Sequence, residues 1–255
     1  MKLAEKIISL APTHTESLFF LGLESRIIGI TENCDYPPRA RRKETFGSWA
    51  YPDVQKIIRA KADLVCTFGK HQEQIAALLM EYGINVFHSD PPTVEDALSD
   101  IKNLGDISGA KNRHNRIKTL YDRLNNVEAR LNGLCSKPSV MRIMNWDPLI
   151  TIGPGTFQFD AVIKAGGENI TKSFTKPYFP ISISRVNELN PKVIFFCEHG
   201  LTQKIYADPA WKNINAVISK KVFHFPCGLT CRSGPRIVDM VERLAHSIHP
   251  ERFNR

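Results

Sequence analysis

The segment that decides the fold is 110-AKNRHNRIKTLYDRLNNVEARLNGL-134, near the middle of a chain of 255 residues. Its apolar residues recur every three or four positions and therefore share one side of a helix, while the opposite side is rich in Arg, Lys, Asn and Glu. The apolar stripe consists of Ile117, Leu120, Leu124, Val127, Leu131 and Leu134. This spacing predicts one long helix over 110–134 that serves as a rigid connector.

Short apolar runs alternate with amphipathic stretches on both sides of this connector. Before it, the predicted strands are Ile7–Leu10, Ile27–Thr31, Asp63–Phe68 and Ile84–His88, and the predicted helices are 13–22, Val54–Ala60 and Gln72–Tyr82. After it, the predicted strands are Val140–Met144, Val193–Cys197 and Val222–Phe225, and the predicted helices are Phe157–Ala165, Ser184–Leu189, Pro209–Val217 and Pro235–Ile248. Thr13 and Glu16 have the spacing of a capping box at the start of the first helix.

Alternating strands and helices predict parallel sheets, because each connection must cross a face of the sheet. The expected fold class is α/β, with two Rossmann-like lobes: an N-terminal lobe at 1–109, the connecting helix at 110–134 and a C-terminal lobe at 135–255. Ligands of such folds bind at the carboxyl ends of parallel strands and between domains. The cleft between the lobes is therefore the expected binding site.

Composition and charge exclude several classes of protein. Hydrophobic residues make up 42% of the chain and charged residues 24%, which excludes a disordered protein. The net charge is +8, but its densest cluster, Arg39–Lys43, lacks the interleaved aromatic residues of a nucleic-acid surface. We therefore expect no nucleic-acid partner.

No apolar run approaches the roughly 20 residues of a membrane-spanning helix. The short polar start before Ile7 also leaves no room for the apolar region of a signal peptide. As written, the chain is expected to be cytoplasmic, or periplasmic or at the cell surface if a leader has been removed.

Several short motifs resemble a known family. In the first half these are Ile7–Glu16, Cys34–Pro38 and Lys61–Val65, and in the second half Ala165–Ile170, Pro177–Pro180, Leu189–Pro191 and Gly234–Arg236. In this order, on either side of a long helix, they resemble the helical-backbone (class III) periplasmic substrate-binding proteins, especially the branch that binds cobalamin and iron chelates. The resemblance implies a non-enzymatic protein that holds a metal-containing ligand between its lobes, most often a corrinoid such as cobalamin in this branch.

The resemblance also implies a set of ligand-contacting residues. A corrinoid or haem needs flat apolar walls with polar groups at the edge. Trp49, Trp146, Tyr178 and Phe179 are the candidate walls, and Asp35, Tyr36, Asp147 and Arg232 are candidate contacts around them. The alternative is that each aromatic residue belongs to an ordinary core.

Members of this family that serve ABC transporters resemble one another in carrying a glutamate on each lobe that binds permease arginines. The corresponding positions here hold Gln55 and Ser184, which are not anionic. A permease partner is therefore a weaker expectation for this chain, although Asp53 and Glu188 lie nearby and offer the missing charge.

Cysteines suggest a second chemistry. Cys34, Cys66, Cys197, Cys227 and Cys231 fall at predicted strand ends or loops, with His71 and His199 close by in the sequence, whereas Cys135 follows the connector. Thiolates are the ligands of iron-sulfur clusters and of soft metal ions, so an iron-sulfur cluster or a thiolate-bound metal is the alternative ligand. Core cysteines, disulfides and a redox pair at Cys227 and Cys231 also fit the sequence.

An enzyme is the remaining alternative, because Cys66 with His71, or Cys197 with His199, could act as nucleophile and base. The sequence contains no nucleophile elbow, P-loop or dinucleotide-binding fingerprint to support it. We therefore predict a binding protein.

Overall fold

The computed structural model describes residues 4–253 and divides into two compact units. Unit 1 comprises the residues up to Pro91 together with Glu95–Leu120, and unit 2 comprises Pro92–Val94 together with the residues from Tyr121 onward. Helix α5 (Arg113–Leu131) passes from unit 1 into unit 2 after Leu120. Both units alternate strands with helices, which confirms the predicted α/β class.

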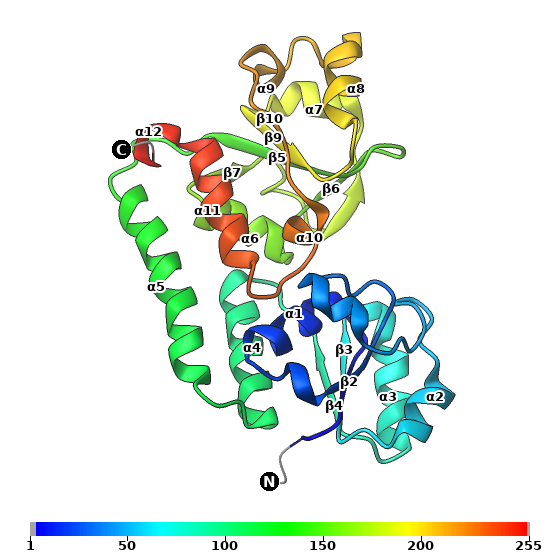
Figure 1. The fold of residues 1–255 in the computed structure, drawn as a ribbon. Helices are drawn as coiled ribbons and strands as arrows, with labels where there is room; N and C mark the ends of the chain where they lie inside the picture. Colours follow the sequence, from blue (N-terminus) through cyan, green and yellow to red (C-terminus); the bar gives the residue numbers. More distant parts are fainter. Residues whose placement is uncertain (1–3, 254–255) are drawn as a thin grey trace. The chain divides into compact units, whose positions relative to one another are not determined.

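Unit 1 is built on a four-stranded parallel sheet in the order β2-β1-β3-β4. Its strands are β1 (Ile7–Ser9), β2 (Ile27–Ile30), β3 (Leu64–Phe68) and β4 (Val86–Ser89). Its helices are α1 (Pro12–Phe20), α2 (Val54–Ala60), α3 (Glu73–Glu81) and α4 (Val94–Ser108), with short 3₁₀ turns η1 (Glu24–Arg26), η2 (Pro38–Arg42) and η3 (Lys70–Gln72). Helices α1 and α4 lie on one side of the sheet and α2 and α3 on the other (Figure 1).

Two features of unit 1 differ from the prediction. Helix α1 begins at Pro12 with Ala11 as its N-cap and no side-chain cap, so the predicted capping box at Thr13 is wrong. Proline is well suited to the first helical position, because its fixed φ fits a helix and its missing N–H would have no partner there. Helix α4 is missing from the prediction, although Val94, Leu98 and Ile101 are buried at helical spacing.

Unit 2 is built on a sheet in the order β10-β9-β5-β6-β8, with β7 also paired to β5. Its strands are β5 (Ser139–Asn145), β6 (Ile150–Ile152), β7 (Glu168–Asn169), β8 (Tyr178–Pro180), β9 (Val193–Phe196) and β10 (Val222–His224). Strands β5, β7, β9 and β10 are parallel, whereas β6 and β8 pair antiparallel. The sheet of unit 2 is therefore mixed, with a parallel half and an antiparallel half.

Helices cover both faces of this second sheet. They are α6 (Phe157–Lys164), α7 (Ile183–Leu189), α8 (Leu201–Ala207), α9 (Asn215–Ile218), α10 (Cys227–Thr230), α11 (Ile237–Ile248) and α12 (Pro250–Phe253), with the 3₁₀ turn η4 (Pro209–Trp211). Helices α6 and α11 lie on one side, and α7, α8 and α9 on the other (Figure 1). The helix predicted over Pro209–Val217 is wrong, because Asp208 caps a short first turn and Asn190 binds the amide of Asn215, so two separate turns form.

Each unit has its own hydrophobic core. In unit 1, Ile8 and Val65 from the sheet pack with Ile57 of α2 and Leu79 of α3. In unit 2, the core includes Ile194 and Phe196 of β9 with the helices that follow. These cores fix the carboxyl ends of the strands, from which the candidate site residues extend.

Candidate functional site

Trp49 of unit 1 is held through its main chain by two side chains. Its amide donates a hydrogen bond to Asn33 Oδ1 at 2.8 Å, and its carbonyl accepts one from Gln72 Nε2 at 2.7 Å. Gln72 is fully buried and also binds the ends of two strands, donating to the carbonyl of Leu10 and accepting from the amide of Phe68. The segment that carries Trp49 is therefore attached to the carboxyl edge of the sheet by one glutamine.

The Trp49 ring is half-buried and meets the exposed His71 edge to face, with 5.2 Å between ring centroids. Asp35 and Tyr36 lie in the loop after β2 that also carries Asn33. Tyr36 is exposed, and Asp35 lies 3.8 Å from the guanidinium of Arg41. The structure thus brings Trp49 and His71 together and places Asp35 and Tyr36 in the loop whose Asn33 binds the Trp49 amide.

In unit 2, Trp146 and Asp147 occupy the turn between β5 and β6. The Trp146 ring stacks on the buried Trp211 with 5.3 Å between centroids, and it packs against the core. Asp147 is exposed at the tip of the turn. Trp146 is therefore tied to the core on one side, which is the alternative that the sequence left open for each aromatic residue.

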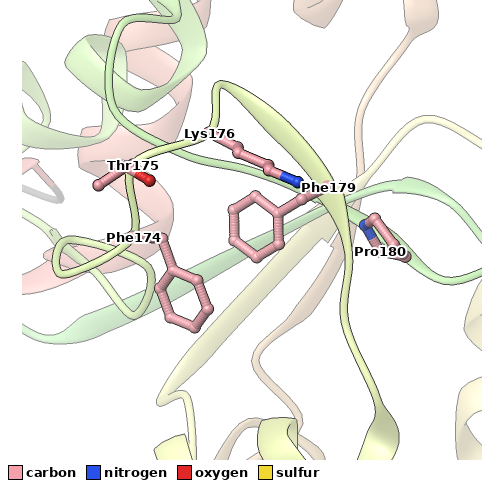
Figure 2. A pocket seen from close by; sticks show the side chains of 5 residues that line it. All are labelled: Phe174, Thr175, Lys176, Phe179 and Pro180. Carbon is pink, nitrogen blue, oxygen red and sulfur yellow. The ribbon is translucent and has the colours of Figure 1, made fainter.

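Tyr178 and Phe179 of β8 face different surroundings. Tyr178 is exposed, and its hydroxyl donates to Gln158 Oε1 at 3.2 Å. Phe179 is buried, stacks on Phe174 at 4.7 Å and belongs to the core of unit 2. It also lines a hollow of about 300 Å³ with Phe174, Thr175, Lys176 and Pro180 (Figure 2). This hollow is at the lower end of the range for small-molecule sites and is too small for a whole corrinoid.

The cysteines fall into three groups. Cys34 is buried among hydroxyl groups, with Thr15 Oγ1 donating to its Sγ at 3.1 Å, and Cys66 is fully buried within β3, where burial raises the pKa of its thiol. Cys135 is exposed. Cys197, Cys227 and Cys231 come together, with their sulfur atoms within 4.8 Å of one another. None of the six forms a disulfide.

The topology of unit 2 explains why these three thiols meet. Cys197 follows β9 directly, and α10, which begins at Cys227 and is closed by Cys231, follows β10. Because β9 and β10 are parallel neighbours, their carboxyl ends lie at the same edge of the sheet. Cys231 Sγ lies 3.6 Å from Cys197 Sγ and 3.3 Å from Cys227 Sγ. Among residues 4–253 this is the one group of three or more candidate metal ligands.

A buried arginine borders the thiols. Arg142 of β5 is 1% exposed, and its Nη2 donates to Cys231 Sγ at 3.3 Å. Hydrogen bonds from the Cys197 and Cys227 thiols lower the pKa of Cys231, and the charge of Arg142 lowers it further. The pKa of Cys227 is raised, because its proton is held in hydrogen bonds with Cys197 and Cys231. Both shifts arise mainly from the hydrogen bonds that join the three thiols.

The remaining candidates lie outside this group. His199 is exposed, with its ring 4.7 Å from that of His224, and neither histidine is part of the thiol group. Arg232 is half-buried just after Cys231, with its guanidinium over Gly228 of α10. Cys34, Cys66 and His71 of unit 1 do not form a metal-ligating group with one another.

Three residues that shape these sites are missing from the sequence prediction: Asn33, Gln72 and Arg142. Arg142 had a detectable signal, since a charged residue inside the apolar strand 140–144 needs a partner. Gln72 and Asn33 had no such signal in the sequence, because their roles depend on hydrogen bonds to main-chain atoms of distant segments.

The two positions at which the resemblance led us to expect permease-binding glutamates are exposed: Gln55 on α2 and Ser184 on α7. The acidic residues nearby are engaged locally. Asp53 caps α2 by accepting from the amide of Lys56, and Glu188 forms an ion pair with Arg185 at 2.6 Å. Both acids are nevertheless exposed, so each presents a negative charge near the expected docking position.

Each of the two units thus has a sheet covered by helices on both faces, with the candidate residues near the strand ends. The model of the periplasmic binding protein family matches residues 7–227. The chain belongs to this family, whose members are substrate-binding proteins and not enzymes. This confirms the prediction of binding over catalysis.

The relatives cover nearly the whole chain. An ABC transporter substrate-binding lipoprotein of Bacillus subtilis, YvrC, is 27% identical over 98% of this chain and 81% of the relative. A vitamin B12-binding protein of Photorhabdus laumondii is 27% identical over 96% of this chain and 88% of the relative. Both names describe binding proteins, and the second agrees with the predicted cobalamin-binding branch of the family.

Solved structures agree with these relatives. The periplasmic vitamin B12 binding protein BtuF of Vibrio cholerae has a TM-score of 0.87 and 25% identity, covering 97% of both chains. The heme-binding protein RhuT of a Roseiflexus species has a TM-score of 0.84 at 18% identity, covering 98% of this chain and 99% of that one, and shows the fold alone.

The names of the relatives also concern the cellular compartment. The names of YvrC and BtuF describe a lipoprotein and a periplasmic protein, so they give no support to the expected cytoplasmic location. Within residues 4–253, no helix combines the length and the apolar character needed to cross a membrane.

Proposed function

We propose that this protein binds a corrinoid of the cobalamin type. The observation that carries the proposal is the similarity, over nearly the whole chain, to the vitamin B12-binding protein of Photorhabdus laumondii and to BtuF of Vibrio cholerae. A corrinoid is a large flat molecule with an apolar face and a polar rim, and it needs aromatic surfaces with a few polar groups beside them.

Both units offer such groups near strand ends. Unit 1 presents the Trp49 ring with His71 at its edge, on a segment fixed by Gln72. Unit 2 presents the exposed Tyr178 ring and the Asp147 carboxylate at the turns of its antiparallel half. Trp49 is the strongest candidate for stacking, because its main chain is fixed and its ring is half-buried. A pre-positioned ring loses little conformational entropy on binding.

The test is a titration of the purified full chain with hydroxocobalamin, haem and a ferric siderophore in parallel, followed by calorimetry and tryptophan fluorescence. We expect one equivalent of hydroxocobalamin to bind with micromolar or tighter affinity and haem to bind at least tenfold more weakly. Preferential binding of haem or of the siderophore would replace the corrinoid, and no binding of any of the three would refute the proposal.

We further propose that the protein delivers its ligand to an ABC permease outside the cytoplasmic membrane. The proposal is supported by the similarity to YvrC, which is named an ABC transporter substrate-binding lipoprotein. The neutral residues Gln55 and Ser184 remove charge pairing from the expected docking positions, so we expect weaker and less salt-dependent docking than with glutamate. Gln55→Glu and Ser184→Glu, introduced together, should tighten binding to the cognate permease at low salt. Unchanged binding would place the contact elsewhere.

A further inference from the structure

The thiol group of unit 2 has a geometry that the proposed corrinoid function does not use. Cys197, Cys227 and Cys231 converge from two neighbouring strand ends, and Cys227 is exposed. A metal ion bound by thiolates at about 2.3 Å in tetrahedral geometry holds its sulfur ligands about 3.8 Å apart. The sulfur separations of 3.3 and 3.6 Å, with all three atoms within 4.8 Å, are close to that value.

The same separations argue against a cubane iron-sulfur cluster. Such a cluster is held by thiolates on different iron atoms, which places the sulfur ligands farther apart than the ligands of one ion. A disulfide between Cys227 and Cys231 would use only two of the thiols. Such a disulfide would not explain why Cys197 and the buried Arg142 also lie beside these two cysteines.

Arg142 supplies an independent observation. It is 1% exposed, and its Nη1 has no hydrogen-bond partner among residues 4–253. Its Nη2 reaches Cys231 Sγ at 3.3 Å and its Nε reaches the sulfur of Met144 at 2.8 Å. A buried guanidinium is costly unless an anion lies beside it. No carboxylate forms an ion pair with Arg142 in the described part of the chain, and its hydrogen bonds go to two sulfur atoms, of which only the Cys231 thiol can become an anion.

Charge then indicates the kind of metal. Three thiolates around a divalent cation carry one net negative charge, which the guanidinium of Arg142 neutralises. Thiolates prefer soft or borderline ions over Mg²⁺ and Ca²⁺. We propose that Cys197, Cys227 and Cys231 bind one divalent ion of the zinc class, with Arg142 as the charge-balancing neighbour.

The fourth coordination position is open in this proposal. His199 and His224 lie outside the thiol group, and the Nε2 of His224 is 3.3 Å from the carbonyl oxygen of Cys197. Water or a small exogenous ligand therefore completes the coordination. Three protein ligands with one open position is the arrangement of zinc sites that exchange a ligand, whereas structural sites use four protein ligands.

The test uses the full chain, purified without oxygen, reduced, freed of metal and titrated with Co²⁺ and then Zn²⁺. We expect one Co²⁺ per chain, with thiolate-to-cobalt charge-transfer bands and the visible bands of a tetrahedral site, displaced by one equivalent of Zn²⁺. Thiol counting before the titration verifies reduction. Because no corrinoid is present, the result does not depend on the proposed corrinoid function.

Variants identify the ligands. Cys227→Ser and Cys231→Ser should each weaken zinc binding by roughly 100-fold or more, and Arg142→Met by about 10-fold, the size of effects from residues beside a metal site. Cys135→Ser, at the exposed cysteine outside the group, should leave it unchanged. Cys227 is exposed, so Cys227→Ser should fold even if replacement of the more buried Cys231 does not.

Several results would overturn the assignment. These are a fully reduced chain without the charge-transfer bands, equal zinc affinity in Cys227→Ser, or several irons with acid-labile sulfide per chain in the isolated protein. The last result would establish a cluster in place of a single ion.

Discussion

The side-chain amide of Gln72 donates to the carbonyl oxygen of Trp49 at 2.7 Å and to that of Leu10 at 3.0 Å. One buried group thus joins the candidate ligand-binding segment to the end of β1, 62 residues away from Gln72 in the sequence. Since both acceptors are main-chain atoms, the link depends on residue 72 and not on the identity of residue 49.

Replacement of this group should loosen the segment. Gln72→Leu removes three hydrogen bonds and leaves buried carbonyl groups without their donor, so we expect a loss of about 2–3 kcal/mol in the free energy of unfolding. The Trp49 emission should also shift to the red as the ring becomes more exposed. Gln74→Leu, on an exposed position of α3, is the control. Equal effects of the two variants would show that Gln72 has no special role.

Removal of the Trp49 ring should weaken ligand binding. If the ring stacks on a corrinoid, Trp49→Ala should raise the dissociation constant for hydroxocobalamin by about 10-fold or more, since a loss of roughly 1.4 kcal/mol corresponds to that factor. The control is Tyr51→Ala, because Tyr51 is nearby and 84% exposed. Calorimetry measures both. Unchanged affinity in Trp49→Ala would remove this residue from the binding site.

The stability of unit 1 should depend on pH through His14. Burial between Phe68 and Phe87 lowers the pKa of His14 from 6.5 to about 4, with a hydrogen bond to the Thr67 carbonyl opposing the shift and the charge of His88 adding to it. Between these pH values the unfolded chain binds the proton and the folded chain does not. The contribution is therefore fully present above pH 6.5 and is lost as pH falls toward 4.

The size of this effect is measured against a variant. The stability advantage of the natural protein over His14→Gln should shrink by roughly 2–3 kcal/mol between pH 7 and pH 4 in urea unfolding. The prediction is stated as a difference between the two proteins because Asp100 changes the stability of both with pH in the opposite direction. Burial raises the pKa of Asp100 to about 6, so its contribution is present at low pH and is lost as pH rises from 3.8 through 6. A constant difference between the two proteins would contradict the His14 prediction.

The hollow beside Phe179 depends on a glycine. A Cβ on Gly153 would lie 2.1 Å from the carbonyl oxygen of Lys176 and 3.1 Å from the Phe179 ring. Because a carbonyl of the main chain cannot move aside easily, Gly153→Ala should destabilise unit 2 by about 3 kcal/mol and change the near-ultraviolet circular dichroism of the stacked rings.

Gly155 provides the comparison for this prediction. A Cβ there meets no atom within 4 Å, and only its positive φ of 83° disfavours alanine, so Gly155→Ala should cost about 1 kcal/mol. If Gly153→Ala costs no more than Gly155→Ala, the close approach of the Lys176 carbonyl does not constrain the hollow.

Sequence patterns predict the elements whose burial follows one period. The stripe from Ile117 to Leu131 gives α5, and the apolar runs give β3 and β9. Strands β6 and β8 escape prediction because each is only three residues long, too short for its burial pattern to establish a period. Strand β6 pairs with β5 across the turn at Asp147, but its pairing with β8 joins segments that are far apart in the sequence, which no local pattern encodes.

Cysteine placement shows the same limit at the candidate site. All five cysteines near strand ends look equivalent in the sequence, but Cys66 is fully buried within β3 and Cys34 contacts buried hydroxyl groups. Cys197 and Cys227 differ because they come after the last residues of neighbouring strands, beyond the sheet itself. The position of a cysteine relative to the last residue of its strand therefore decides whether its thiol is buried in the core or joins the thiol group.

The anchoring of Trp49 through its main chain has an evolutionary consequence. Asn33 and Gln72 hold the backbone at this position whatever side chain it carries. A single codon change can thus replace the flat indole by a smaller, charged or hydrogen-bonding group without remodelling the scaffold. Under the ligand contact proposed for Trp49, new cargo preferences can arise at this position by few mutational steps, at little cost to folding.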